Sequence, residues 1–207
     1  ALHLQRQNPP AAATHLNYDD TVGGALTENA QTVAYTFDAD AGDIVRLRLG
    51  ETVSPPEFGM NIYAPSGTLL ASTWEYGLSE ILTEPLPVAG AYGVLVWEFP
   101  GTETGTYNLH LQRVHRPANA TGIAYGETLT STIDLAAETD AYRFEGEAGD
   151  LVLRRLAEVG AALSPQIRLY DGGGALLAGA NGGELARIDG FELPAAGIYS
   201  VLVMDSA

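Results

Sequence analysis

The sequence contains no cysteine in its 207 residues. No disulfide can therefore stabilise the fold and no thiolate can bind a metal or attack a substrate, so stability must come from the burial of apolar side chains. Lysine is also absent. The ten cationic residues, all of them arginines, stand against 26 acidic residues and give a formal net charge of −16. Such a charge repels polyphosphates, which argues against nucleic acid as a partner.

Long apolar runs and catalytic motifs are absent as well. The longest apolar stretch, residues 86–97, is far shorter than the roughly 20 residues of a membrane-spanning helix, so we expect no membrane span. The chain has no G-x-S-x-G or H-E-x-x-H motif, and its four histidines, His3, His15, His110 and His115, do not have the spacing of metal ligands. We therefore expect a protein that is not an enzyme and holds no cofactor.

What the sequence does contain is a repeat with an offset of 107 residues, seen for example between Tyr35 and Tyr142. Three pairs of segments share this offset: residues 35–49 with 142–156, 86–96 with 193–203, and 2–6 with 109–113. Identity is eight of fifteen positions in the first pair, eight of eleven in the second and five of five in the third. Several blocks at one period indicate a duplicated domain.

The phase of the repeat predicts the domain boundaries. Repeat 1 covers residues 18–113 and ends with a closing strand at 104–113, whereas repeat 2, at residues 123–207, lacks the equivalent strand. A linker at 114–122 joins the two repeats. Residues 1–17 supply a spare copy of the closing strand, "LHLQR", followed by a proline-containing linker.

Apolar and polar residues alternate in the segments between clusters of Gly, Pro and Asp. Val45, Leu47 and Leu49, for example, alternate with Arg46 and Arg48. This period of two predicts half-buried β-strands, and no segment sustains a helical stripe. Short strands separated by turn signals predict an all-β protein with one antiparallel β-sandwich of about 100 residues per repeat.

Four motifs follow one another in repeat 1, and the first three recur in repeat 2. The first is an aromatic strand, an "AGD" turn and an apolar strand (35–49 and 142–156), and the second is "IYAPSGTLL" (62–70) or "LYDGGGALL" (169–177). The third is "AGAYGVLV" (89–96) or "AGIYSVLV" (196–203), and the fourth, in repeat 1 alone, is "TGTYNLHL" (104–111). In this order they resemble the bacterial pre-peptidase C-terminal domain family. The resemblance implies two tandem jelly-roll-like β-sandwiches. It also implies a secreted or surface-exposed bacterial protein, a frequent position beside a peptidase, and no catalytic role for the domains themselves.

The missing closing strand should leave repeat 2 with an open main-chain edge and an uncovered core. Two buried leucines contribute about 1.5–3 kcal/mol each and four or five hydrogen bonds about 1 kcal/mol each, which approaches the roughly 5–15 kcal/mol that stabilise a whole domain. Either the chain continues into its own closing strand, or a segment of another subunit inserts by β-strand addition. We predict that the donor strand is Leu2, His3, Leu4, Gln5 and Arg6. The predicted acceptor edge in repeat 2 is Tyr199, Val201 and Val203.

Both routes string domains together, as a head-to-tail homopolymer or as a longer tandem array. The sequence thus favours a non-enzymatic structural protein that forms an extracellular or cell-surface fibre, stalk or sheath. An alternative is that the repeats are substrate-binding or targeting accessories of a secreted peptidase or other hydrolase. A further alternative is that residues 1–6 are only the end of a preceding repeat in a longer array.

Arg154 and the two histidines of the closing-strand sequence each allow two interpretations. Arg154 stands where repeat 1 has Leu47, so either a β-bulge changes the register or the side chain reaches an interface or solvent. His3 and His110 share one repeat position between leucines that point inward. We expect them to face solvent or a neighbouring domain.

The acidic segment "DADAGD" at residues 38–43 could supply oxygen ligands to calcium. The second copy reads "EGEAGD", and no twelve-residue calcium loop with a terminal Glu follows. We therefore favour a solvated turn, with Asp43 beside Gly42, over a calcium site.

Three aromatic residues of repeat 1, Trp74, Tyr76 and Trp97, could form a carbohydrate-binding platform. Their equivalents in repeat 2 are not aromatic but Asn181, Gly183 and Met204. Because the feature is not shared by the repeats, we favour core or interface packing for these side chains.

Overall fold

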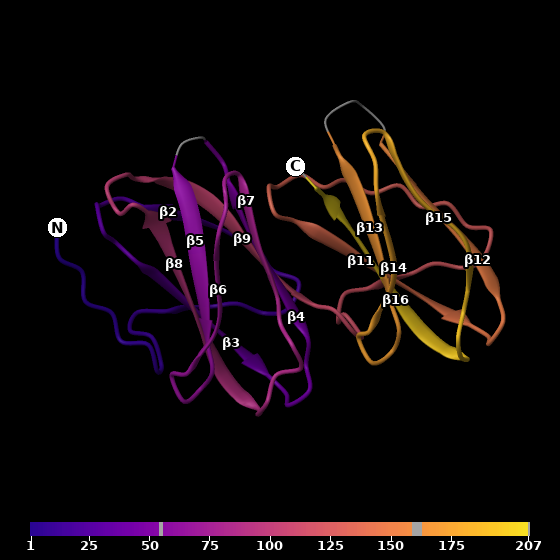
Figure 1. Ribbon diagram of the computed structural model, residues 1–207, viewed down its shortest axis with the longest axis horizontal. Helices are drawn as coiled ribbons and strands as arrows, with labels where there is room; N and C mark the ends of the chain where they lie inside the picture. Colours follow the sequence, from indigo (N-terminus) through magenta and orange to yellow (C-terminus); the bar gives the residue numbers. More distant parts are fainter. Residues whose placement is uncertain (54–55, 159–162, 207) are drawn as a thin grey trace. The chain divides into compact units, whose positions relative to one another are not determined.

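The computed structural model describes residues 1–53, 56–158 and 163–206. These residues form sixteen β-strands and no helix, which confirms the predicted all-β fold. Nothing in this part of the chain qualifies as a membrane-spanning helix. The chain divides into two compact units (Figure 1). Unit 1 comprises Ala1–Gln112 with Leu135–Ala137, and unit 2 comprises Arg113–Asp134 with Glu138–Ala207.

Unit 1 is a sandwich of two β-sheets. Its strands are β1 (Thr14–His15), β2 (Thr21–Leu26), β3 (Val33–Ala39), β4 (Val45–Glu51), β5 (Glu57–Tyr63), β6 (Leu69–Trp74), β7 (Leu78–Leu82), β8 (Gly90–Phe99) and β9 (Gly105–Arg113). One sheet has the order β1-β3-β8-β5-β6 and the other the order β2-β9-β4-β7. The pairs β2–β9, β3–β8, β4–β7, β5–β6 and β5–β8 are antiparallel, whereas β1 runs parallel to β3.

Inward side chains of both sheets form one core in unit 1. Val45, Leu47 and Leu49 of β4 are buried in it, as their alternation with the arginines predicts. From the other sheet, Phe37 and Tyr92 stack with ring centroids 5.5 Å apart. The core is therefore closed on both sides by strands.

Unit 2 repeats the larger sheet of unit 1. Its strands are β10 (Thr121–Gly122), β11 (Thr139–Gly146), β12 (Leu151–Ala157), β13 (Pro165–Tyr170), β14 (Leu176–Asn181), β15 (Leu185–Glu192) and β16 (Gly197–Asp205). The order β10-β11-β16-β13-β14 matches β1-β3-β8-β5-β6 strand for strand at the offset of 107. Phe144 and Tyr199 stack at 5.4 Å, like Phe37 and Tyr92. The second sheet differs, because among the described residues it contains only β12 and β15.

The predicted acceptor edge at Tyr199, Val201 and Val203 is wrong. These residues lie on β16, which pairs with β11 on one side and with β13 on the other, so its main-chain groups are already used. Hydrophobic alternation identifies a segment as a strand but does not identify its neighbours. The unpaired edge of unit 2 lies on another strand.

The "AGD" turns are confirmed in both units. Gly42 and Gly149 have φ values of 90° and 87°, which glycine adopts without strain. In unit 1 the Asp43 carboxylate accepts hydrogen bonds from the Tyr18 hydroxyl (2.7 Å) and the Asp40 amide (3.1 Å). Among the described residues no group of three or more His, Asp or Glu side chains could hold a metal ion.

Candidate strand-acceptor site

The closing strand β9 completes the smaller sheet of unit 1 and has no counterpart among the described residues of unit 2. In unit 1, β9 lies between β2 and β4. Its inward side chains Tyr107, Leu109 and Leu111 are buried in the core. The Tyr107 hydroxyl shares a hydrogen bond of 2.9 Å with the Tyr35 hydroxyl of the opposite sheet. One strand thus supplies main-chain pairing on two sides and a polar link across the sandwich.

Unit 2 has an open edge at β12, the equivalent of β4. β12 pairs with β15 on one side, and the described residues provide no strand on its other side. The equivalent of β2, residues 128–133, forms no strand, and no strand of the described residues lies in the position that would pair with it. Figure 1 shows β12 and β15 as a separate pair in unit 2. Sequence reasoning missed this edge, which could have been found only from the strand order of unit 1.

The core of unit 2 is correspondingly less covered. Leu49 of β4 is fully buried, whereas its equivalent Leu156 on β12 is only partly buried. Leu26 of β2 is buried, but its equivalent Ile133 is partly exposed. Among the described residues, the buried apolar cluster has twenty members in unit 1 and ten in unit 2. The two cores differ in the region that β9 covers.

Tyr142 has lost the partner that its equivalent Tyr35 finds on β9. Tyr35 is buried, and burial raises the pKa of its hydroxyl. Tyr142 is only partly buried and instead donates to the carboxylate of Asp140 on its own strand at 3.4 Å. The inner face of β11 therefore has a polar group where unit 1 has a buried tyrosine pair.

Arg154 occupies the core position of Leu47. The register of β12 on β15 shifts between Val152 and Arg154, as a β-bulge or a local irregularity causes, yet Arg154 still points toward the core residue Phe144. The guanidinium carbon of Arg154 lies 4.3 Å from the centroid of the Phe144 ring. Both terminal nitrogens are buried without a hydrogen-bond partner, and desolvation lowers the pKa of Arg154 to about 10. A long charged side chain thus partly fills the space that a closed core would give to leucine.

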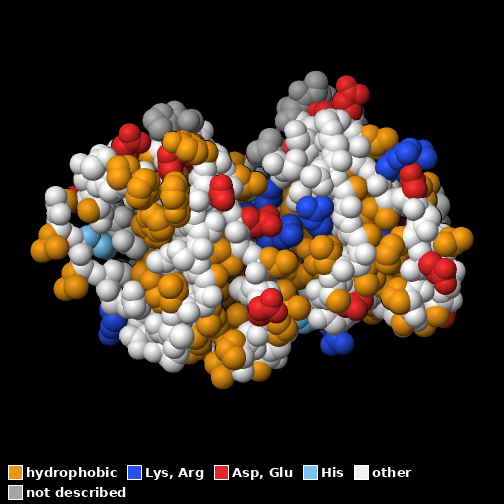
Figure 2. Space-filling model, viewed as in Figure 1, with side chains coloured by type: hydrophobic (Ala, Val, Ile, Leu, Met, Phe, Trp, Pro, Cys, Tyr) orange, Lys and Arg blue, Asp and Glu red, His pale blue; other side chains and the backbone are white. Residues whose placement is uncertain are grey.

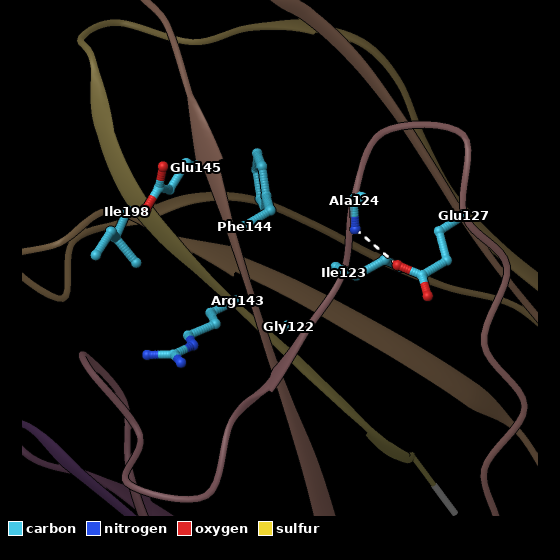
Figure 3. A pocket seen from close by; sticks show the side chains of 8 residues that line it. All are labelled: Gly122, Ile123, Ala124, Glu127, Arg143, Phe144, Glu145 and Ile198. Carbon is cyan, nitrogen blue, oxygen red and sulfur yellow. Dashed lines mark hydrogen bonds between the residues drawn. The ribbon is translucent and has the colours of Figure 1, made fainter.

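A hollow in unit 2 lies beside the loop that follows β10 (Figure 3). Its lining residues are Gly122, Ile123, Ala124, Glu127, Arg143, Phe144, Glu145 and Ile198. Glu127 holds the loop by accepting a hydrogen bond of 2.9 Å from the Ala124 amide. In unit 1 the equivalent loop is tied to β9, because the Asp19 amide donates to the Leu111 carbonyl and the Leu111 amide to the Asp20 carbonyl. The hollow of unit 2 therefore adjoins the loop whose equivalent in unit 1 bonds the closing strand.

The predicted donor residues form no strand in this structure. Leu2 and Leu4 are 98% and 93% exposed, although their equivalents Leu109 and Leu111 are fully buried. Gln5 bonds the Ala11 carbonyl at 2.9 Å, and Arg6 bonds the Pro9 carbonyl at 2.8 Å. His3 and Gln5 line a second hollow on the outer face of unit 1. The segment thus presents two large apolar side chains to solvent.

His110, the equivalent of His3, lies on β9 and is buried rather than solvent-facing. Its Nδ1 lies 2.7 Å from the Thr21 hydroxyl, and its Nε2 lies 3.4 Å from Gln112 Oε1. Burial lowers the pKa of His110 to about 4, and the charge of Arg48 acts in the same direction. The ring is therefore neutral at physiological pH.

No protein-family model and no curated protein matches the chain. Among solved structures, it is similar to a pre-peptidase C-terminal domain of collagenase from Bacillus anthracis, with 19% identity and a TM-score of 0.41 over 51% of this chain and 99% of that one. It is also similar to a periplasmic inhibitor of g-type lysozyme from Aeromonas hydrophila, with 18% identity and a TM-score of 0.39 over 48% and 96% of the two chains. A surface-associated copper-binding protein of Methylomicrobium album BG8 gives 8% identity and a TM-score of 0.42 over 49% and 98%.

Proposed function

We propose that the chain is a non-enzymatic structural protein of the cell exterior whose units join end to end by strand addition. One observation carries the proposal. The sequence "LHLQR" occurs once as the buried strand β9 and once as a solvent-exposed segment, while the sheet of unit 2 has an open edge at the place that β9 occupies in unit 1. The occupant we assign to the β12 edge is residues 2–6 of a second copy.

The energetics favour such a contact. Transfer of Leu2 and Leu4 from solvent to the core of unit 2 would contribute about 1.5–3 kcal/mol each. Main-chain pairing with β12 would add about 1 kcal/mol per hydrogen bond, less the cost of ordering the segment. The donor lies on unit 1 and the acceptor on unit 2, so the contact is heterologous. Contacts of this kind continue into filaments unless the rotation closes a ring.

The same slot would accept a closing strand from a following part of a longer chain, which yields a tandem array instead of a homopolymer. The two sources are distinguished by the donor segment itself, since only the homopolymer requires Leu2 and Leu4. The extracellular or cell-surface location rests on the resemblance of the two repeats to pre-peptidase C-terminal domains. The same resemblance supports an alternative to the structural role, in which the two repeats are a binding or targeting accessory of a secreted hydrolase.

The test is the mass of the chain in solution as a function of concentration, measured by analytical ultracentrifugation and electron microscopy. We expect the native chain to assemble and the double variant Leu2→Asp, Leu4→Asp to remain monomeric with unchanged circular dichroism, because both side chains are exposed in the single chain. The matched control, Leu69→Asp with Leu176→Asp, adds the same charge at exposed leucines of β6 and β14 and should assemble like the native chain.

A synthetic peptide of residues 1–6 provides an independent measurement. It should bind the donor variant, raise the thermal midpoint of unit 2 and stop growth of the native polymer. The proposal is overturned if the native chain stays monomeric at high concentration and the peptide leaves the thermal midpoint unchanged. Assembly of the donor variant at the native level would overturn it too.

A further inference from the structure

A strip of aromatic side chains lies on the outer face of the five-stranded sheet of unit 1. Trp74 of β6 and Phe99 of β8 stack with centroids 4.8 Å apart and planes 22° apart, yet they remain 46% and 48% exposed. Trp97 lies over Gly59, where an added Cβ would come within 2.6 Å of the indole ring. Because Gly59 pairs with Trp74 on one side and Trp97 on the other, the strip crosses β6, β5 and β8.

The fold itself does not require this strip. The equivalents of Trp74, Trp97, Phe99 and Gly59 in unit 2 are Asn181, Met204, Ser206 and Gln166. The inward aromatic stacks of the two sheets, in contrast, are retained in both units. Figure 2 shows hydrophobic side chains gathered on unit 1 over β5 and β6. The exposure of Trp74 and Tyr76 shows that core packing, one of the two roles favoured from the sequence, is wrong for these side chains. Large rings exposed together on one face indicate a binding surface.

Polar groups border the rings. Asn61 Oδ1 accepts hydrogen bonds from the Trp97 indole (3.2 Å) and the Ser72 hydroxyl (2.7 Å), which fixes the orientation of the amide beside the strip. Tyr76 is exposed, and the side chain of Glu57, followed by the charges of Glu103 and Glu51, raises the pKa of its hydroxyl. The charged groups that act on Tyr76 are all carboxylates, so an anionic ligand would be repelled here.

We propose that this strip binds a neutral glycan. A pyranose ring has an apolar C–H face that packs on an aromatic ring, and an edge of hydroxyl groups that bond amides, hydroxyls and carboxylates. With neighbouring strands about 4.8 Å apart, the strip from β6 to β8 is about 10 Å wide, which accommodates a disaccharide. The acidic border excludes acidic polysaccharides. The strip lies on unit 1 and the acceptor edge on unit 2, but the donor segment reaches the strip, because His3 and Gln5 line one hollow together with Asn61 and Trp97.

Intrinsic tryptophan fluorescence tests the proposal directly, because the two tryptophans of the chain are Trp74 and Trp97. The probes are cellohexaose, chitohexaose and maltohexaose, with polygalacturonate as the acidic comparison. We measure in the Leu2→Asp, Leu4→Asp background, so that failure of assembly and failure of glycan binding are distinguishable. At least one neutral oligosaccharide should shift the emission saturably, and polygalacturonate should not.

Trp74→Ala should weaken binding of that oligosaccharide about tenfold, with Trp97 as the remaining reporter, and Trp74→Phe should restore part of it. Leu176→Ala, which trims an exposed apolar side chain on β14 of unit 2, is the matched control and should bind like the native sequence. The proposal is overturned if none of the three neutral oligosaccharides changes the emission at millimolar concentration. It is equally overturned if Trp74→Ala binds as tightly as the control.

Discussion

Replacement of Arg154 by leucine should stabilise unit 2. The guanidinium sits at the position of the fully buried Leu47, and its two terminal nitrogens are buried without hydrogen-bond partners. The shift of its pKa from 12.5 to about 10 corresponds to at most about 3 kcal/mol of desolvation, and solvent screening of the partly exposed side chain reduces this value. The cation–π contact with Phe144 offsets about 0.5–1 kcal/mol of this desolvation cost.

Leucine at this position would also bury apolar surface against Phe144, so we expect a net gain of about 1–3 kcal/mol. The reverse substitution, Leu47→Arg, places the same charge in the closed core of unit 1 and should cost about 3–5 kcal/mol. The pair compares one side chain in an open and a closed version of the same site.

Urea denaturation of the full chain separates the two effects. Tryptophan emission follows unit 1, because both tryptophans lie there, and circular dichroism follows both units. Arg154→Leu should move the circular dichroism transition to higher urea without moving the tryptophan transition, and Leu47→Arg should lower the tryptophan transition. If Arg154→Leu instead weakens unit 2, the cation–π contact outweighs desolvation and the open-core argument is refuted.

Two further predictions concern unit 1. The pKa of His110 is about 4 in the folded chain, because the ring is buried, and near 6.5 in the unfolded chain. The stability that the neutral ring contributes to unit 1 is therefore fully present above pH 6.5, and up to about 3 kcal/mol of it is lost as the pH falls to 4. Urea titrations monitored by tryptophan emission should show this loss of stability in the native chain and not in His110→Gln. An equal dependence of the unfolding free energy on pH in the two proteins would contradict the argument. Tyr35→Phe strands the buried Tyr107 hydroxyl and should cost unit 1 about 1–3 kcal/mol, whereas Tyr142→Phe should cost unit 2 less than about 0.5 kcal/mol, and equal thermal shifts would contradict the argument.

The strands and turns of both units could be predicted because their signals are local. Alternation in Val45, Leu47 and Leu49 and the glycine of each "AGD" turn act within a few residues. The acceptor edge could not be predicted, because it depends on which strands become neighbours in the sheet. Tyr199 and Val201 carry the same apolar pattern whether β16 lies at an edge or in the centre. The sequence could not decide between the two interpretations of Arg154 for a similar reason, since a charged residue at an inward position does not reveal how the backbone adjusts.

Specificity is the remaining question for an open sheet edge. An unpaired strand with exposed leucines, as β12 has at Leu151 and Leu153, is a template for indiscriminate pairing. A net charge of −16 opposes this, because every approach of two copies costs electrostatic work unless the contact is favourable enough to exceed it. In the proposed assembly, a segment that repeats residues 109–113 of β9 would meet that condition better than an arbitrary strand, because its two leucines would pack on a core that keeps the stacked pair Phe144 and Tyr199. If the chain assembles as proposed, long-range repulsion combined with one short matched segment would favour ordered end-to-end growth over aggregation.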